Sequence, residues 1–543
     1  MKARLWGLLA GMVVSMLASQ GFAAAPSVVE LAPAVDSKAG RIAQLNGVTL
    51  SSIYCVPTTV EVGAAGSERC VVGELEAQVS AILAEYLQVP VSIEDLLLLK
   101  DRLNQLYALH GFINTGVNIP DQEIAAGVLR LDLTLGQVDR LTITSELNAG
   151  YISPRLQLTR PFNLQALQTR LKLLEQDPRV RRIDARVAPG DTLGKADLSL
   201  AVDTQPAFAL GLSLANDRAP AIGANNARLR AEANNLTGWG DSLQGSVSVT
   251  RGLNAYDVRL GLPLMANDLS VALEHSRSDS SVIEEPFAAI NVDSQTRSTG
   301  IVFDLPVRRT LASTLSLGLT LESRRNQTFL LGQPFSFSEG AVNGESRVTP
   351  VRLAVAYMHQ GQLASLATRL SVSYGTGYRN PTEHDAVADG RFTAYVGQLQ
   401  YSRLLSEHFY MTGKLLLQYT DSPLLAIEKF AVGGAGSVRG YRENQLVRDK
   451  AGLLSMEGRY RVAALPGLEL LSFFDWGSGE NAAGSTSAGR DTLYSVGAGV
   501  AYRGASGLGM DLFFAHGFND FPVVERNWQD DGIHFRLSYD YRF

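Results

Sequence analysis

The C-terminal part of the chain is built from short segments in which apolar and polar residues alternate. From about residue 205 to residue 543, about sixteen such segments follow one another, separated by turns rich in Gly, Asn, Asp and Ser. Clear examples are 207–215, 242–250, 311–321, 366–374, 392–401 and 408–419. A transmembrane barrel strand needs about 9–11 residues, and about 340 residues leave about 21 for each strand with its turn. A soluble β-sandwich would show similar alternation, so alternation alone does not distinguish the two folds. The number of segments favours a barrel, as does the N-terminal signal pattern described below.

The last of these segments alternates without a break up to the C-terminus. Its apolar face consists of Ile533, Phe535, Leu537, Tyr539, Tyr541 and Phe543. Its polar face consists of His534, Arg536, Ser538, Asp540 and Arg542. A strand that merely ends the chain could show this alternation. It would not explain three aromatic residues at the end of the apolar face, the last of them at the C-terminus.

The N-terminus has the pattern of an export signal. Lys2 and Arg4 precede an apolar run over residues 5–17, and the small residues Ala23, Ala24 and Ala25 follow. A transmembrane anchor would need about 20 apolar residues, and this run is shorter. We therefore expect a signal peptide over residues 1–23. Since no other segment has the pattern of a spanning helix, a membrane domain would have to be a β-barrel.

The two cysteines, Cys55 and Cys70, lie close together near the start of the mature chain. In an oxidising periplasm a bridge between them would close a loop of about 15 residues, which stabilises a fold by roughly 3 kcal/mol. The alternative is two unrelated buried thiols. We expect the disulfide, since neither a CxxC pair nor a nearby His suggests a metal site.

Composition and motifs exclude several classes of function. A net charge of −6 gives no support to nucleic-acid binding. The seven histidines are scattered, and no nucleophile elbow, P-loop or dinucleotide fingerprint occurs. The pair Asp530-Asp531 is expected to be solvated rather than catalytic. We therefore expect no enzyme, no metal and no cofactor, and an outer-membrane protease or lipase has no motif to support it.

Between the leader and the barrel the pattern is mixed α/β. Residues 24–46 form an Ala/Pro-rich lead, and about 47–204 contain two similar units. Elements predicted in the first unit are helices at 72–86 and from Ser92 to Gly111, and strands at 113–120 and 127–135. Elements predicted in the second unit are a strand at 138–144, a helix at 164–175 and strands near 182–187 and 196–202.

These two units resemble a known pair of domains. The stretch GFINTGVNIPDQEIAAGVLRLDL, from Gly111 to Leu133, is similar to the first POTRA domain of two-partner secretion translocators of the haemolysin-activator type. PFNLQALQTRLKLL from Pro161, continuing to the ADLSL strand at 196–200, resembles their second POTRA domain. The chain departs from the family pattern at Leu135-Gly136 and in the turn at 175–179. The expected fold is mainly β: POTRA domains at 47–137 and 138–204, then an about 16-stranded transmembrane barrel at 205–543.

Two short motifs in the barrel region carry the same resemblance. Val438-Arg439-Gly440-Tyr441 is similar to the tip of the family's long sixth extracellular loop. Phe473-Phe474-Asp475-Trp476-Gly477 is similar to the F-x-D-x-G motif of its thirteenth strand. The resemblance implies that the loop folds into the barrel and that Arg439 meets Asp475 on the inner wall. The planar fork of Arg can grip a carboxylate through two hydrogen bonds, and Gly440 permits a sharp turn. The alternative is an Arg and an Asp that never meet.

The resemblance also implies a function. A member of this family sits in the outer membrane, its POTRA domains in the periplasm, and exports a large, mostly β-helical partner exoprotein without nucleotide hydrolysis. The POTRA domains would bind the unfolded partner along an exposed strand edge. Barrel-assembly machinery would recognise the terminal Tyr539, Tyr541 and Phe543. The alternative is a factor that assembles other barrels; a passive porin would not explain the periplasmic domains.

An N-terminal plug helix inside the barrel, which relatives often have, is not expected here. Only about twenty mature residues precede the first POTRA domain, and with twelve of them helical the rest could reach only about 35 Å. Pro33 and Gly40 also interrupt this stretch. We therefore expect the sixth loop to be the main obstruction of the pore.

Overall fold

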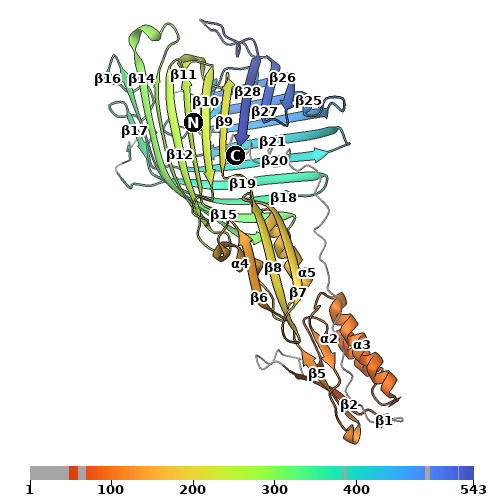
Figure 1. Ribbon diagram of the computed structural model, residues 1–543. Coiled ribbons are helices and arrows are strands. Elements are labelled where there is room, and N and C mark those ends of the chain that lie inside the picture. Colours follow the sequence, from red (N-terminus) through yellow and green to blue (C-terminus); the bar gives the residue numbers. More distant parts are fainter. Residues whose placement is uncertain (1–47, 59–68, 380, 384–387, 484–488, 524) are drawn as a thin grey trace. The chain divides into compact units, whose positions relative to one another are not determined.

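The computed structural model describes residues 48–58, 69–379, 381–383, 388–483, 489–523 and 525–543 (Figure 1). The predicted signal peptide, the lead at 24–46 and the question of a plug helix lie outside these residues. The chain divides into two compact units, the first ending at Gln205 and the second beginning at Pro206. The first unit contains two α/β domains and the second is a β-barrel.

The first α/β domain packs two helices on a small sheet. Its elements are β1 (Val48–Thr49), β2 (Ser52–Pro57), α2 (Glu76–Ala84), β3 (Pro90–Val91), α3 (Ile93–Leu109), β4 (Gly116–Asn118), the 3-10 turn η2 (Ala125–Gly127) and β5 (Val128–Thr134). The sheet order is β2-β5-β4, with β2 parallel and β4 antiparallel to β5. Helix α3 begins at Ser92, whose side chain accepts from the N–H of Asp95 while Asp95 accepts in return. Its Leu99 and Leu103 are fully buried in the domain core.

Helix α2 is shorter than the predicted 72–86. It begins only at Glu76, because Gly73 just before it has a positive φ of 59° and turns the chain away from helical geometry. The apolar spacing that suggested a longer helix is still used, since Val72, Leu75 and Tyr86 are all buried in the same core. The apolar residues on either side of α2 are therefore explained by burial in the core, although they lie outside the helix.

The second α/β domain repeats this plan. Its elements are β6 (Gln137–Ser145), α4 (Ala149–Leu156), α5 (Leu164–Glu175), β7 (Val180–Pro189) and β8 (Lys195–Thr204), with sheet order β6-β8-β7. Helix α5 has the predicted bounds and is capped by Asn163, whose side chain accepts from the N–H of Ala166. Helix α4 was not predicted, because it is only 8 residues long and contains Pro154. It nevertheless buries Tyr151 and Ile152 in the domain core.

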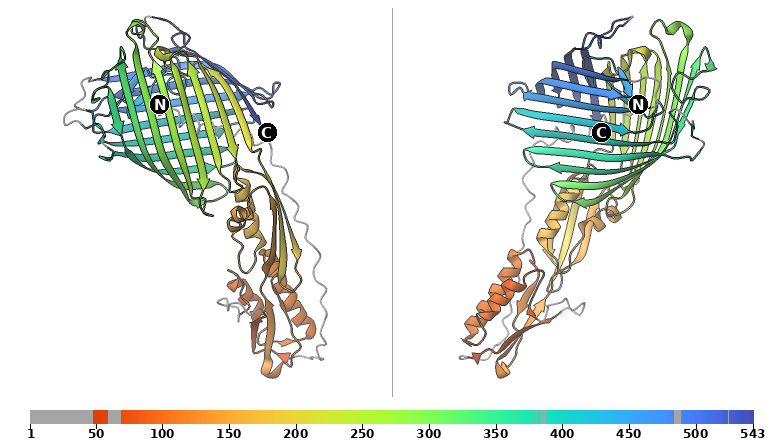
Figure 2. Two further views of the ribbon diagram at one scale, coloured as in Figure 1. Left: turned by 60° about the vertical axis from the view of Figure 1, so that its left-hand side comes forward. Right: turned by 180° about the vertical axis from the view of Figure 1, so that it is seen from behind.

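The barrel consists of sixteen long strands in the described part of the chain, and it closes on itself. They are β9 (Phe208–Ala215), β10 (Asn226–Asn234), β11 (Ser242–Thr250), β12 (Leu253–Pro263), β13 (Ser270–Ser281), β14 (Val292–Arg309), β15 (Ser313–Leu330), β18 (Pro350–Gln360), β19 (Ala364–Gly375), β20 (Thr393–Leu404), β21 (Phe409–Thr420), β24 (Lys450–Arg461), β25 (Leu468–Glu480), β26 (Arg490–Arg503), β27 (Leu508–Gly517) and β28 (Ile533–Arg542). The last strand pairs with the first, from Arg536 opposite Ala215 to Arg542 opposite Ala209. Figure 2 shows the strands running obliquely around the barrel wall. The predicted fold class is confirmed.

Shorter elements connect these strands. They are the strands β16 (Gln333–Pro334), β17 (Glu345–Val348), β22 (Phe430–Val432) and β23 (Leu446–Arg448) and the 3-10 turns η3 (Pro220–Ile222) and η4 (Ala288–Ile290). Strand β15 continues well past the predicted end at residue 321 and stays paired with β14 up to Leu330 opposite Val292. That extension is rich in polar residues, such as Ser323 and Asn326, so apolar alternation could not reveal it.

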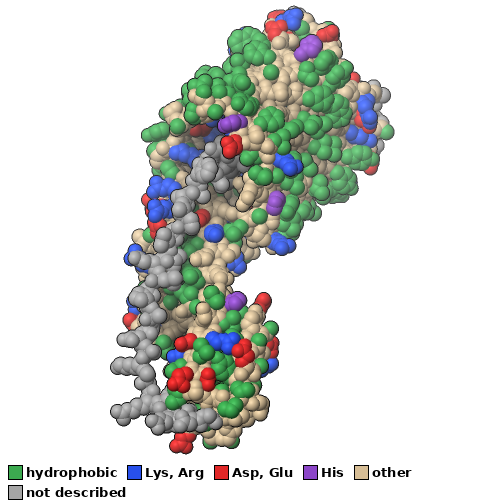
Figure 3. Space-filling model, turned by 90° about the vertical axis from the view of Figure 1, so that its right-hand side faces the viewer, with side chains coloured by type: hydrophobic (Ala, Val, Ile, Leu, Met, Phe, Trp, Pro, Cys, Tyr) green, Lys and Arg blue, Asp and Glu red, His purple; other side chains and the backbone are tan. Residues whose placement is uncertain are grey.

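The outer face of the barrel is apolar. On β9 the side chains of Leu210, Leu212 and Leu214 are exposed, whereas inward residues such as Asp475 on β25 are buried. Figure 3 shows hydrophobic side chains gathered over the outside of the barrel strands. Among the described residues, no helix is long and apolar enough to cross a membrane. Alternating strands with an apolar outer face suit a wall surrounded by lipid.

Candidate functional site

The candidate site is formed by the segment between β21 and β24, residues 421–449, which we call loop 6. Its strands β22 and β23 pair as a short hairpin. Four apolar residues of the loop are buried together with three inward-facing residues of the wall strands. The loop residues are Val432, Val438, Tyr441 and Leu446, and the wall residues are Ala451, Leu453 and Leu493. Loop 6 is therefore packed against the inner wall of the barrel.

Arg439 at the tip of loop 6 grips Asp475 of β25. Its Nε donates to Oδ2 at 2.7 Å and its Nη2 donates to Oδ1 at 2.9 Å, which is the two-bond fork geometry. The backbone N–H of Arg439 also donates to Oδ2 at 3.2 Å. Asp475 is fully buried and Arg439 is 6 % exposed. A buried pair of this kind holds its partners in place because loss of either one would strand the other charge.

Further groups of the wall complete the surroundings of the Arg439 guanidinium. Glu457 of β24 accepts from Nη1 at 2.7 Å, and Ser455 donates to Oδ1 of Asp475 at 2.6 Å. The ring of Phe473 lies 3.4 Å from the guanidinium carbon, measured to the ring centroid. Alternation along β25 puts Phe473 and Asp475 on the inner face, whereas Phe474 points outward and is 40 % exposed. The first letter of the F-x-D-x-G motif therefore supplies a cation–π contact.

The residues after Arg439 fix the direction of the loop. Gly440 has a φ of 88°, which disfavours a side chain, and its N–H donates to Nε2 of His534 on β28 at 2.9 Å. The hydroxyl of Tyr441 donates to the carbonyl of Tyr494 on β26 at 2.9 Å. With Phe513 of β27, whose ring centroid lies 5.2 Å from the Arg439 guanidinium carbon, the five wall strands β24 to β28 contact the Val438–Tyr441 motif.

Several polar and charged residues at this site were not predicted. Glu457 and Ser455 lie one strand away from the F-x-D-x-G motif and belong to neither motif. Arg442, next to the V-R-G-Y motif, pairs with Glu284 at 2.7 Å and with Asp530 at 2.5 Å. The expectation that Asp530 is merely solvated was therefore wrong. An available signal was the inward position of Glu457, which alternation along β24 would have shown.

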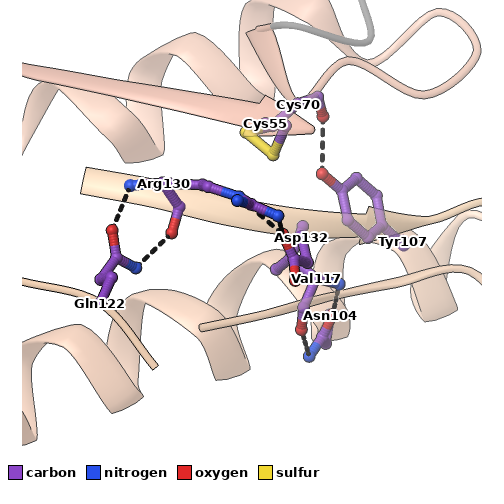
Figure 4. Close-up of a disulfide and its surroundings, with 8 residues drawn as sticks. All are labelled: Cys55, Cys70, Asn104, Tyr107, Val117, Gln122, Arg130 and Asp132. Carbon is purple, nitrogen blue, oxygen red and sulfur yellow. Dashed lines mark hydrogen bonds and ion pairs between the residues drawn. A yellow bond between two sulfur atoms is a disulfide. The ribbon is translucent and has the colours of Figure 1, made fainter. Parts of the chain in front are cut away.

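The two cysteines form a disulfide that joins β2 to the segment before α2 (Figure 4). Both are buried in the core of the first α/β domain. The hydroxyl of Tyr107 on α3 donates to the carbonyl of Cys70 at 2.6 Å. Burial raises the pKa of the Tyr107 phenol, so the hydroxyl remains a donor at physiological pH. The bridge and this hydrogen bond tie the edge strand to α3.

The aromatic residues of the last strand face outward, and Phe543 helps to close the barrel. Tyr539, Tyr541 and Phe543 are exposed on the outer face. Phe543 exchanges two backbone hydrogen bonds with Phe208, the first residue of β9, at 3.0 and 3.1 Å, and their rings stack at 5.7 Å. Among the described residues, no group of acidic, His or Cys side chains could hold a metal ion.

An outward-apolar barrel with a loop packed on its inner wall, in a chain that also carries two α/β domains, defines the class of outer-membrane β-barrel proteins. Residues 71–136 match the POTRA domain, ShlB-type. Residues 194–503, more than half of the chain, match the haemolysin secretion/activation protein family ShlB/FhaC/HecB. The chain belongs to this haemolysin secretion/activation family.

Individual relatives agree with this assignment. The chain is 24 % identical over 470 residues to the heme/hemopexin transporter protein HuxB of Haemophilus influenzae (strain 86-028NP), covering 81 % of this chain and 80 % of that protein. It is 22 % identical over 419 residues to the outer membrane transporter CdiB of Dickeya dadantii (strain 3937), covering 73 % and 71 %.

Solved structures share the fold. CdiB from Escherichia coli superimposes with a TM-score of 0.67 at 15 % identity, over 95 % of this chain and 94 % of that one. CdiB from Acinetobacter baumannii gives a TM-score of 0.64 at 16 % identity, over 99 % and 98 %. The protein is an outer-membrane transporter of a two-partner secretion system, with periplasmic POTRA domains. The predicted family, function and location are confirmed.

Proposed function

We propose that this transporter exports one unfolded partner exoprotein through its barrel, and that loop 6 obstructs the lumen until the partner engages. The observation that carries this proposal is the Arg439–Asp475 pair, which holds the loop tip on the inner wall. Export needs no catalytic centre of the transporter's own, because the partner is threaded rather than chemically changed. In the outer membrane the apolar face of the barrel contacts lipid, and barrel-assembly machinery inserts it by its terminal strand.

The POTRA domains are proposed to hold the partner before it enters the barrel. The sheet orders β2-β5-β4 and β6-β8-β7 leave edge strands to which, among the described residues, no further strand is paired. Of these edge strands, β7 is the longest with 10 residues, and β6 follows with 9 residues. An unfolded segment could add to such an edge, taking affinity from main-chain hydrogen bonds. Arg181 and Arg182 on β7 are exposed, but each pairs with an aspartate of the same sheet, Asp203 and Asp184, so main-chain pairing rather than charge would supply the affinity.

The test is a deletion of this gene followed by analysis of secreted and outer-membrane proteins. We expect one large polypeptide to disappear from the culture medium and to return on complementation with the wild-type gene. Complementation with Arg439→Ala should restore the barrel to the outer membrane but return little of that polypeptide. A general loss of other barrel proteins from the outer membrane, with the medium unchanged, would instead support an assembly factor.

A further inference from the structure

Loop 6 forms a second buried ion pair with the barrel wall, several strands away from the place where the loop tip binds Asp475. Glu428, in the stretch between β21 and β22, is fully buried. One carboxylate oxygen accepts from Nη1 of Arg324 on β15 at 2.7 Å. The same carboxylate accepts from Nη2 of Arg352 on β18, at 2.9 and 3.1 Å. Strands β19, β20, β21 and β24 separate this part of the wall from β25 and Asp475.

The wall at this place is electrostatically incomplete without the loop. Arg324 and Arg352 bring two positive charges, and Glu322 of β15, which accepts from Arg352 at 3.2 Å, brings one negative charge. Glu428 supplies the second negative charge. If the loop left, an uncompensated guanidinium would remain on a wall where the side chains of Arg324 and Arg352 are now only 7 % and 18 % exposed.

Two positions on the loop, Glu428 and Arg439, therefore carry opposite charges, and each meets a part of the barrel wall with the complementary charge. Strands β24 and β25 present the carboxylates Glu457 and Asp475, which bind Arg439. Strands β15 and β18 present arginines, which bind Glu428. No residue contacts both Glu428 and Arg439 among these ion pairs, so each can break while the other stays intact.

We propose that Glu428 is a second anchor of loop 6, a positioning residue that keeps the loop in the lumen independently of the Arg439–Asp475 pair. This inference rests on the proposed role of loop 6 as the obstruction. It means that release of the loop tip alone does not clear the lumen. A partner must also displace Glu428 from Arg324 and Arg352, and an acidic segment of the partner could take its place on the two guanidinium groups.

The test follows the accessibility of loop 6 with a reporter cysteine. Gly436 at the loop tip suits it, because no atom lies within 4 Å of where its Cβ would be. Intact cells that carry Gly436→Cys are treated with a bulky, membrane-impermeant maleimide, and the labelling rate is compared among Glu428→Ala, Arg439→Ala and the double variant. Because the free energies of independent contacts add, their equilibrium effects multiply: about tenfold for each single variant predicts about a hundredfold for both.

Two controls accompany these variants. Arg439→Ala combined with Asp475→Ala removes both partners of one pair and should label no faster than Arg439→Ala alone. Glu480→Ala removes a carboxylate whose partner Arg490 is 68 % exposed at the barrel rim, and should leave the rate unchanged. Heat-modifiable migration on gels verifies that each barrel is folded. Should Glu428→Ala fail this check, Glu428→Gln removes the charge with little change in shape, and the same multiplication is expected.

Three outcomes decide the matter. Rates that multiply in the Glu428/Arg439 double variant, with a parallel rise in single-channel conductance, support the second anchor. A double variant no faster than Arg439→Ala overturns the second anchor but leaves the obstruction by loop 6 standing. A parent protein that already labels as fast as the double variant overturns the obstruction itself, and the anchor with it.

Discussion

Val438 of loop 6 packs directly onto the bare Cα of Gly477 on β25. A methyl group on Gly477 would lie 2.9 Å from Cγ2 of Val438 and 2.5 Å from Cγ1 of Val432. Both distances are far shorter than the 3.5–4.0 Å or so at which carbon atoms attract. The glycine that ends the F-x-D-x-G motif is thus explained by the loop: it leaves room for Val438 beside the Asp475 that binds the neighbouring Arg439.

Replacing Gly477 should therefore displace loop 6 without touching the ion pair itself. We expect Gly477→Ala to insert into the outer membrane and to label about tenfold faster at Gly436→Cys, because overpacking costs about 1–3 kcal/mol. Gly413→Ala on β21 is the matched control, since no atom lies within 4 Å of its added methyl group. Equal labelling of the two alanine variants would show that the contact does not position the loop.

Breaking the Arg439–Asp475 pair from either side should give the same defect. We expect Arg439→Ala and Asp475→Ala to reach normal outer-membrane levels but to secrete the partner about tenfold less or worse, because a stranded buried charge costs about 3–5 kcal/mol. The double variant should be no worse than either single variant, since the two residues act as one unit. Secretion is measured by immunoblot of the medium. Defects that add in the double variant would refute the coupling.

Loss of the disulfide should weaken the first POTRA domain alone. The bridge joins residues 15 apart, and cross-linking a loop of that length stabilises by about 3 kcal/mol. We expect Cys55→Ser with Cys70→Ser to lower the unfolding temperature of the periplasmic transition in calorimetry of the full protein. The heat-modifiable migration of the barrel should not change. Adding a reductant to the wild type should reproduce the shift, and an unshifted transition in both experiments would contradict the prediction.

Deleting Phe543 should slow barrel assembly, because the last strand loses both its terminal aromatic residue and two backbone hydrogen bonds to Phe208. We expect reduced outer-membrane levels of the deletion variant in a pulse-chase experiment, with the soluble POTRA domains still resistant to protease. Phe543→Tyr keeps an aromatic ring and the backbone, and is expected to assemble normally. Normal assembly kinetics after the deletion would count against a terminal assembly signal.

The strands were the most predictable part of this protein, for a physical reason. In a barrel surrounded by lipid, the outward side chain at every second position must be apolar, so each strand can be recognised from its own alternating pattern in the sequence. Strand β11 has the predicted bounds, and the residues of β28 alternate as expected. Prediction failed where the apolar periodicity was absent or interrupted. The extension of β15 is polar, so it shows no alternation. Helix α4 contains Pro154, which argued against a helix, although its Tyr151 is buried in the domain core.

The sequence by itself determined that this chain is an exported barrel with two α/β domains. It also predicted that Arg439 and Asp475 form an ion pair. Only the tertiary structure decided which other charges meet loop 6. Glu428 is 104 residues from Arg324 and 76 from Arg352, and Glu457 lies outside both motifs. Alternation requires only that an inward residue be polar. The sequence pattern is therefore the same whichever partner that residue binds. Partners are chosen by the path of the loop through the lumen, which exists only once the barrel has closed around it.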